Sequence, residues 1–449
     1  MGLKLIAVCA LALSMCIPAL FVFALVLDRT SREGKVVKEV GSTVGGRQTF
    51  LGPTLAIPYD IPPQGPAGSG HRGIYIVFPA AASATVKTST EERHRSLFRV
   101  PVFQADLKMD ASFDLTGAPA AAPEGAVLDW SHAEIVVGVS DARGALADAL
   151  LDVNGKTATM APAEVSQRIA IGGEQGPPLN LTLFGADAGD LAKPGARFDA
   201  TATLRFSGAQ RIALLAYGKT TRVHMQGDWP NPGFDGGFLP ASRTVSASGF
   251  SADWLVPFIA RGVRAEGPSD SVTALGATAL GVSFVEMADP YQSVSRSLKY
   301  VPLFLGLIFL SYFIFEVSTR KRVHLAQYIL VGVAQIIFYL LLLSFAERIG
   351  FDLGFLLGGA ATVLLLAANA RWVFASRTQG VRALAIFTLL YGLIYMLLRL
   401  EDNALLVGAI ASFLAVAAAM YFTRGIDWYS SLPGDGAGQQ GDSTPGASN

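Results

Sequence analysis

The sequence predicts a membrane protein of mixed class, with one N-terminal transmembrane helix, a large mainly-β periplasmic domain and a C-terminal bundle of five transmembrane helices. Three observations predict this. Residues 300–422 form a nearly continuous apolar run that only short charged clusters interrupt. A separate apolar segment, residues 5–27, lies at the other end of the chain. Between them, residues 30–296 are rich in Asp, Arg, Gly and Pro and have no long apolar run, a composition typical of soluble domains.

The first apolar segment predicts an uncleaved membrane anchor within residues 1–29. It is longer than the roughly 7 to 15 residues of a signal-peptide core, and no small-residue cleavage site follows it. Cys9 and Cys16 both lie in this segment. The soluble region therefore has no cysteine for a disulfide, a metal site or a nucleophile. Residues 32–44 keep a helical pattern, so we expect a helix to continue past the anchor.

Residues 30–296 predict a mainly antiparallel β domain, either a sandwich or two packed β subdomains. Runs rich in β-forming residues alternate with Gly, Pro, Asn and Asp at short intervals. These runs are residues 73–78, 97–103, 133–139, 197–206 and 221–225. Residues 152–156 have the sequence of a hairpin turn. An α+β domain is the alternative interpretation.

The five further spans are predicted within residues 297–424, near 300–317, 327–345, 355–374, 383–398 and 404–422. The charged clusters between them lie roughly 20 to 30 residues apart, which suits helices that cross a bilayer at about 1.5 Å per residue. Positive charges gather at 320–322 and 371–382, and such loops are expected in the cytoplasm. Alternation then places both termini in the cytoplasm. The polar residues 425–449 predict a disordered cytoplasmic tail.

The sequence contains no motif for catalysis, a cofactor or a metal. HExxH, the P-loop and the GxSxG elbow are absent from it. The formal net charge is zero, and no basic stripe interleaved with aromatic residues indicates a nucleic-acid partner. We therefore expect no catalytic residue, no cofactor and no metal site.

Polar residues at membrane depth are the candidate structural or functional side chains, because buried ionisable groups are costly there. They are Glu316, His324, Gln327, Glu347, Glu401 and Asp402. The simpler interpretation is that each is a solvated or a helix-end charge, with Glu316 pairing Arg320 one turn later. The sharper interpretation is a polar network between helices that fixes the bundle or couples it to the outer domain.

Several long motifs are shared with a known family. They lie at residues 52–58, 227–254, 260–262, 289–291, 296–300, 315–316, 323–328, 338–344, 347, 401–406 and 423–429; the longest reads GDWPNPGFDGGFLPASRTVSASGFSADW. Through these motifs the chain closely resembles the CreD family of inner-membrane proteins. The chain departs from the family pattern after Glu347, where the family has His and this chain has Arg348.

The resemblance implies a bacterial inner-membrane protein that supports cell-envelope integrity and tolerance of envelope stress and colicins, induced with a two-component regulatory system. It implies no enzymatic reaction. The expected partners are the lipid bilayer and a periplasmic protein or cell-wall component. A transporter or channel component is one alternative. A membrane enzyme that acts on lipid or glycan at the outer interface, through Glu347, Glu401 or Asp402, is another.

The candidate interaction loop is sought first within residues 233–262, because residues 233–238 are Gly-rich and aromatic. Its named residues are Trp229, Phe234, Asp235, Gly236, Phe238 and Arg243. The simpler interpretation of the same stretch is a tight turn between strands.

Overall fold

The computed structural model describes residues 2–63, 70–95, 98–166, 168–172, 178–284, 290–319, 321, 323–399 and 404–424. These residues divide into two compact units. One consists of Met1–Arg32 and Ala288–Asn449 and is helical, and the other is Glu33–Met287 and is mainly β. The predicted tail 425–449 lies outside the described residues, as do Glu401 and Asp402.

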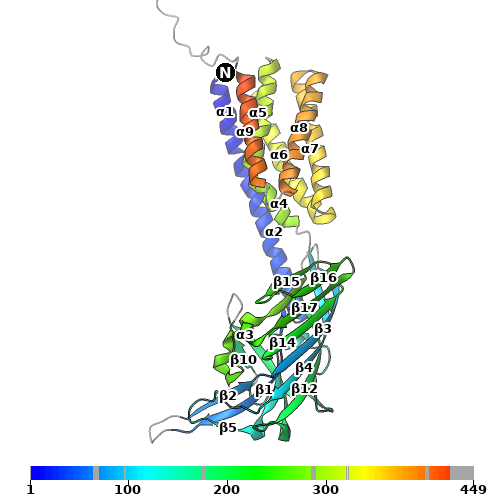
Figure 1. The fold of residues 1–449 in the computed structure, drawn as a ribbon. Coiled ribbons are helices and arrows are strands. Elements are labelled where there is room, and N and C mark those ends of the chain that lie inside the picture. Colours follow the sequence, from blue (N-terminus) through cyan, green and yellow to red (C-terminus); the bar gives the residue numbers. More distant parts are fainter. Residues whose placement is uncertain are drawn as a thin grey trace, which may run out of the picture. The chain divides into compact units, whose positions relative to one another are not determined.

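The predicted N-terminal anchor is a long helix with one interruption. It consists of α1 (Gly2–Ser14) and α2 (Cys16–Thr43), which follow one another directly in Figure 1. The interruption at Met15 is explained by Pro18, which has no N–H to donate to Ser14 and whose ring crowds the Ser14 carbonyl. The end of α2 at Thr43 confirms the expected helix beyond the anchor.

The C-terminal block has helices at all five predicted positions. They are α5 (Val301–Thr319), α6 (Leu325–Ile349), α7 (Phe351–Phe374), α8 (Arg377–Arg399) and α9 (Ala404–Thr423), preceded by a short helix, α4 (Pro290–Lys299). Among the described residues, five helices are long and apolar enough to cross a membrane: the combined segment Ile6–Thr43, and α5, α6, α7 and α8. Membrane crossing by α9 stays a prediction.

The β unit is built from two sheets, which confirms the predicted mainly-β fold. The main path of the first sheet is formed by β10 (Arg168–Ile171), β11 (Leu179–Asp187), β6 (Glu134–Val139), β1 (Gln48–Ile61), β13 (Arg211–Leu214), β19 (Leu280–Phe284) and β15 (Pro232–Gly236). Its branches are β2 (His71–Val77), β5 (Val127–Leu128), β9 (Ala161–Pro162) and β18 (Glu266–Pro268).

The second sheet runs in the order β16 (Ser242–Ser246), β17 (Gly249–Val256), β14 (Thr220–Gly227), β3 (Ala81–Arg95), β4 (Phe98–Asp114), β12 (Arg197–Ala209), β7 (Leu150–Val153) and β8 (Lys156–Thr159). Most pairs are antiparallel, with parallel pairing of β1 with β13 and of β3 with β14. Short helices connect the strands: α3 (Phe258–Arg261) and the 3-10 turns Trp130–His132, Ala142–Gly144, Gly189–Leu191 and Ser269–Thr278.

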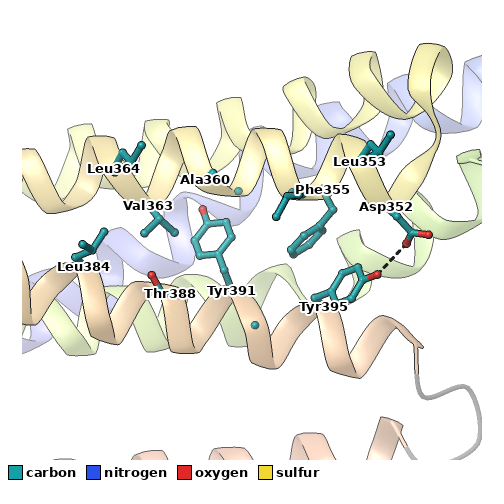
Figure 2. A pocket seen from close by; sticks show the side chains of 13 residues that line it. Asp352, Leu353, Phe355, Ala360, Val363, Leu364, Leu384, Thr388, Tyr391 and Tyr395 are labelled. Atoms are coloured by element: carbon teal, nitrogen blue, oxygen red, sulfur yellow. Dashed lines mark hydrogen bonds between the residues drawn. The ribbon is translucent and has the colours of Figure 1, made fainter.

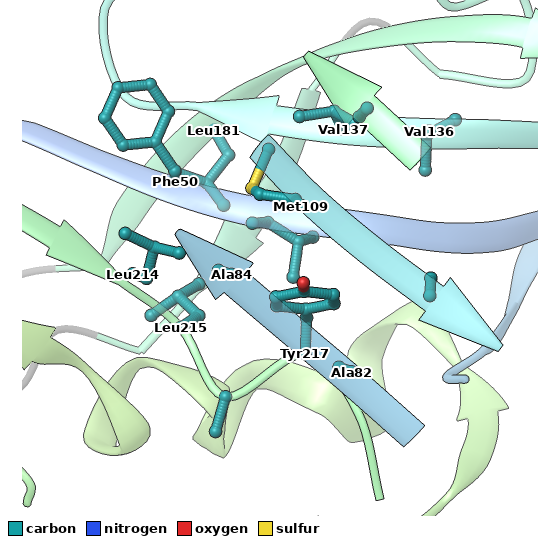
Figure 3. Close-up of a cluster of buried hydrophobic side chains, with 14 of the residues drawn as sticks. Phe50, Ala82, Ala84, Met109, Val136, Val137, Leu181, Leu214, Leu215 and Tyr217 are labelled. Atoms are coloured by element: carbon teal, nitrogen blue, oxygen red, sulfur yellow. The ribbon is translucent and has the colours of Figure 1, made fainter. Parts of the chain in front are cut away.

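One apolar core is shared by the two sheets (Figure 3). Long strands such as β3 alternate between exposed and buried positions along much of their length, as expected for a strand with one face on a core. Tyr217 lies within this core, and its hydroxyl donates to the backbone oxygens of Ser83 at 2.6 Å and Asp110 at 3.0 Å. Its ring occupies the space above Gly52, where a Cβ would approach ring carbons within 2.6 Å. The glycine of the 52–58 motif therefore serves core packing.

The last turns of α2 belong to the β unit. Val37 and Val40 pack against a small apolar cluster that contains Val44, Val100 and Val102. This cluster explains why the helix stays ordered beyond its most apolar part, since most helical stability in proteins comes from packing of an apolar face.

Candidate functional site

Glu316 is a buried carboxylate near the end of α5, with a side chain only 2% exposed. The backbone N–H of Val323 donates to its Oε1 at 3.1 Å, and the Tyr328 hydroxyl donates to its Oε2 at 2.9 Å. The Lys4 ammonium also donates to Oε1. Glu316 is therefore a charge near a helix end, as the simpler interpretation allows, but it is buried and not solvated. Its predicted partner Arg320 lies outside the described residues.

Lys4 joins α1 to the same point of the bundle. The Lys4 Nζ donates to Glu316 and also to the carbonyl of Val323, the latter at 2.5 Å. The carboxylate thus accepts from groups on α1, on α6 and in the segment between α5 and α6. Burial of a single charge is costly, and the cost is offset only when partners of opposite charge and good geometry remain in place. This cluster of Lys4, Glu316, Val323 and Tyr328 is suited to holding helices together.

His324 and Gln327 serve different local roles at the start of α6. His324 is the N-cap residue, and its Nδ1 accepts from the backbone N–H of Ala326 at 3.2 Å. Gln327 Oε1 accepts from Asn369 Nδ2 of α7 at 3.2 Å. Asn369 Oδ1 in turn accepts from the Tyr312 hydroxyl of α5 at 2.9 Å. Gln327 therefore belongs to an interhelical network, whereas His324 caps the N-terminus of α6.

A further buried group was not predicted from the sequence. The Tyr391 hydroxyl of α8 donates to Gln335 Oε1 of α6 at 2.8 Å, and Gln335 is fully buried. Gln335 Nε2 and the nearby Tyr339 hydroxyl have no hydrogen-bond partner. A glutamine within a long apolar helix is the only sequence signal of this contact. It indicates that polar side chains link the helices along the bundle as well as at its ends.

Glu347 lies at the opposite end of α6 from His324. Its Oε1 accepts from the Tyr291 hydroxyl of α4 at 3.0 Å and lies 3.9 Å from Arg29 Nε of α2. The predicted candidates Glu316 and Glu347 are thus at opposite ends of the helices, and the structure does not bring them together into one site. Each instead links helices locally.

The aromatic residues of the candidate interaction loop mainly pack inward. Trp229 is buried, and its ring lies 6.2 Å from that of Phe284. The centre of the Phe234 ring, on β15, lies 6.1 Å from that of Phe250 and 6.0 Å from that of Trp254. The carbonyl of Phe238 accepts from the Trp254 indole N–H at 3.1 Å.

The acidic and glycine residues of this stretch are also structural. Arg211 Nε donates to Asp235 at 2.7 Å, which ties β15 to β13. Gly236 has a backbone φ of +116°, which residues other than glycine rarely adopt. At Gly237 a Cβ would lie 1.8 Å from the carbonyl oxygen of Ala277. The glycines are therefore required here because another segment of backbone approaches too closely to leave room for a side chain.

Arg243 lies on the exposed strand β16, with its guanidinium 5.6 Å from the centre of the Phe234 ring. The exposed part of the loop is therefore β16, which is an edge strand of the second sheet, as β15 is of the first.

Arg261, at the end of α3, is a buried cation that sequence reasoning missed. It is 3% exposed, and Nε, Nη1 and Nη2 all lack a hydrogen-bond partner. The guanidinium lies 3.9 Å from the centre of the Phe78 ring. Removal from water lowers the pKa of Arg261 to about 10. Arg261 belongs to the shared motif at residues 260–262, but the motif carries no signal that this arginine is buried.

Within the described part of the chain, no group of three or more His, Cys, Asp and Glu side chains is placed to hold a metal ion. The polar side chains of the bundle contact one another across helices, and this arrangement can position helices and resist their separation.

Comparison with known proteins supports the resemblance of the sequence motifs. A sequence model of the family described as "Inner membrane protein CreD" matches residues 1–429. The inner membrane protein CreD of Escherichia coli (strain K12) is 29% identical over 425 residues, which cover 93% of this chain and 91% of that protein.

Proposed function

Because the chain belongs to the CreD family of inner membrane proteins, we propose that it supports cell-envelope integrity as a multi-pass, non-enzymatic membrane protein. The observation that carries the proposal is the pairing of the bundle's polar groups. Glu316, Gln327 and Glu347, which an enzyme or a transport path would need to be accessible, are engaged in contacts between helices. The bundle then anchors the β domain, and the β domain makes the functional contact.

We further propose that both termini are cytoplasmic and the β domain is periplasmic. The contacts support this arrangement. Lys4, at the start of α1, contacts the end of α5, so both lie at one end of the helices. Arg29 approaches Glu347 at the other end. Lys321 and the arginines of 371–382 belong to the first end, and an excess of positive charge is typical of the cytoplasmic side.

Alkaline phosphatase fusions test the topology. A fusion after Arg424 should be inactive, and a fusion within the β domain after Gly227 should be active. An active C-terminal fusion would contradict the arrangement.

The β domain has an edge suited to a partner of extended conformation. Strand β16 is an edge of its sheet, and every residue of it is exposed. An unpaired strand edge offers backbone N–H and C=O groups that an added strand can use. Val245 on β16 is an exposed apolar side chain, and Leu239, three residues before the strand, is another. We propose that a periplasmic protein, rather than a cell-wall glycan, binds here by strand addition.

A photoreactive residue in place of Thr244 on β16 tests this edge. The matched control is Thr157, an exposed threonine on β8 at the opposite edge of the same sheet. One periplasmic protein should crosslink specifically from 244. Val245→Asp should remove this crosslink and also increase leakage of a periplasmic enzyme. Equal crosslinking from both edges, or normal envelope retention in the Val245→Asp strain, would argue against the proposal.

Amide substitutions in a deletion strain separate this function from the enzyme alternative. Glu347→Gln, Glu401→Gln and Asp402→Asn should each restore envelope retention at wild-type protein level. Glu316→Gln should reduce envelope retention only as far as it lowers the protein level. Loss of function by any of the four at normal protein level would favour an enzyme.

A further inference from the structure

A long groove runs between α7 and α8 (Figure 2). It has a volume of about 610 Å³ and an apolar lining apart from a few groups at one end and along α8. Its walls are one stripe of each helix: from α7, Asp352, Leu353, Phe355, Leu356, Gly359, Ala360, Val363 and Leu364, and from α8, Leu384, Thr388, Tyr391, Gly392 and Tyr395.

Small residues keep the groove open. Gly359 and Ala360 on α7 and Gly392 on α8 line the groove with almost no side chain. A Cβ built at Gly392 would have no atom within 4 Å. Leu353, Leu356 and Leu364 on its rim are more than half exposed, so the groove opens outward from the bundle. In a membrane this opening faces lipid, and dispersion contacts favour filling it with hydrocarbon.

The length of the groove matches one leaflet. From Asp352 to Leu364 the α7 wall rises by about 18 Å at 1.5 Å per residue. Half of a hydrocarbon core of about 30 Å is about 15 Å. A groove that begins at a helix end therefore reaches roughly from the membrane surface to the bilayer centre, which is the depth of one acyl chain.

The surface end of the groove carries two opposite charges. Arg399 and Asp352 form an ion pair, and the Tyr395 hydroxyl donates to Asp352 Oδ1 at 3.1 Å. Arg399 Nε donates to the Tyr395 hydroxyl at 3.3 Å. Both charged side chains are about half exposed and can be reached from the membrane surface. An adjacent cation and anion complement a headgroup that itself contains both charges.

We propose that this groove binds one phospholipid with an amine-bearing, zwitterionic headgroup. One acyl chain lies between α7 and α8 over Gly392. The headgroup phosphate accepts from Arg399, and its ammonium donates to Asp352. This site is independent of the function proposed for the β domain.

The dimensions favour a lipid chain over a partner helix. A helix with side chains is about 10 to 12 Å across, so an 18 Å length of it has a volume of more than about 1,400 Å³. The groove offers about 610 Å³. A helix would lie mostly outside it, whereas a single hydrocarbon chain fits between the two stripes.

Native mass spectrometry of the full-length protein, released from nanodiscs that contain phosphatidylethanolamine and phosphatidylglycerol in equal amounts, tests the proposal. Gly392→Leu fills the groove from α8, and Ala360→Leu fills it from α7. Gly306→Leu is the matched control, because Gly306 of α5 is an exposed helical glycine with equally open space around it. Arg399→Gln and Asp352→Asn test the headgroup contacts.

The wild-type protein and Gly306→Leu should retain one phosphatidylethanolamine. Both groove-filling variants should retain about tenfold less, a loss equivalent to about 1.4 kcal/mol. Arg399→Gln should weaken retention of both lipids, and Asp352→Asn should remove the preference for phosphatidylethanolamine. Equal retention by folded groove-filling and control variants, or a bound protein mass in place of lipid, would overturn the proposal. Equal retention of the two lipids by the wild type would overturn the headgroup assignment.

Discussion

The helix bundle and the β domain bury charge in opposite ways. In the bundle, the Glu316 carboxylate accepts from a lysine, a tyrosine and a backbone N–H. In the β domain, the Arg261 guanidinium is equally buried but lies on the Phe78 ring without a hydrogen-bond partner. A guanidinium is more weakly hydrated than an ammonium and stacks on aromatic rings, which makes this second arrangement tolerable.

The difference reflects what drives each region to fold. Apolar helices gain little from contacting one another in lipid, because lipid tails are as apolar as leucine. Polar contacts therefore contribute to the choice of neighbouring helices. The β domain instead buries an apolar core away from water, and this term is large enough to outweigh one unfavourable buried charge.

The largest expected effect is the loss of one partner of Glu316. Lys4→Met leaves the carboxylate buried without its counter-charge, and breaking a buried pair in this way costs about 3–5 kcal/mol. We expect a clear fall in the thermal unfolding midpoint of the detergent-solubilised protein. Addition of Glu316→Gln to Lys4→Met should recover much of the loss, because the double variant buries no charge.

The matched control is Lys35→Met, which removes an exposed lysine of α2. It should leave the midpoint nearly unchanged. If both lysine variants lowered the midpoint equally, the Glu316 cluster would not be what distinguishes the bundle from the β domain.

The positions of the membrane helices could be predicted because their signal is local. The predicted segment 404–422 and the observed helix Ala404–Thr423 differ by one residue. The strand at 197–206 was equally recognisable and extends to Ala209. In contrast, β3 alternates in residues such as Ala, Ser and Thr, which carry a weak hydrophobic signal, and it was missed.

The side-chain contacts could not be predicted because they join distant parts of the chain. Lys4 and Glu316 are 312 residues apart, and no local pattern links them. Within one turn of a helix Arg320 was the natural partner for Glu316. Similarly, Gly237 has the sequence signature of a turn, and only the position of the Ala277 carbonyl shows why no side chain fits there.

Replacement of Arg261 should change the stability of the protein less than Lys4→Met does, and it should raise the stability instead of lowering it. The folded-state pKa of about 10 lies below the usual value of an arginine, so folding disfavours the charged form at every pH below about 10. This shift corresponds to about 3 kcal/mol, and the contact with Phe78 returns about 1–2 kcal/mol. Arg261→Met should therefore stabilise the β domain by about 1–2 kcal/mol.

Hydrogen–deuterium exchange of β2 and β18 in the full chain measures this gain as slower exchange. Arg261→Lys keeps a cation that is more strongly hydrated and should exchange faster than the wild type. Faster exchange in Arg261→Met would show that the arginine has a stabilising partner, and the contrast with Glu316 would fail.

The smallest effect is expected for an exposed pair in the β domain, His224 on β14 and Asp253 on β17, whose Nδ1 and Oδ1 are 2.7 Å apart. The hydrogen bond from His224, with one from Ser242, lowers the pKa of Asp253. A lowered carboxyl pKa adds stability above the unfolded-state value near 4, and this stability is lost as the pH falls through the folded-state pKa. His224→Gln should cost only about 0.2–1 kcal/mol at neutral pH, as exposed pairs do. The difference in unfolding midpoint between His224→Gln and the wild type should shrink below about pH 4.

The control is His94→Gln, at an exposed position of β3, which should show no such pH dependence. A loss as large as that of Lys4→Met would mean that burial does not set the value of a charge contact in this protein.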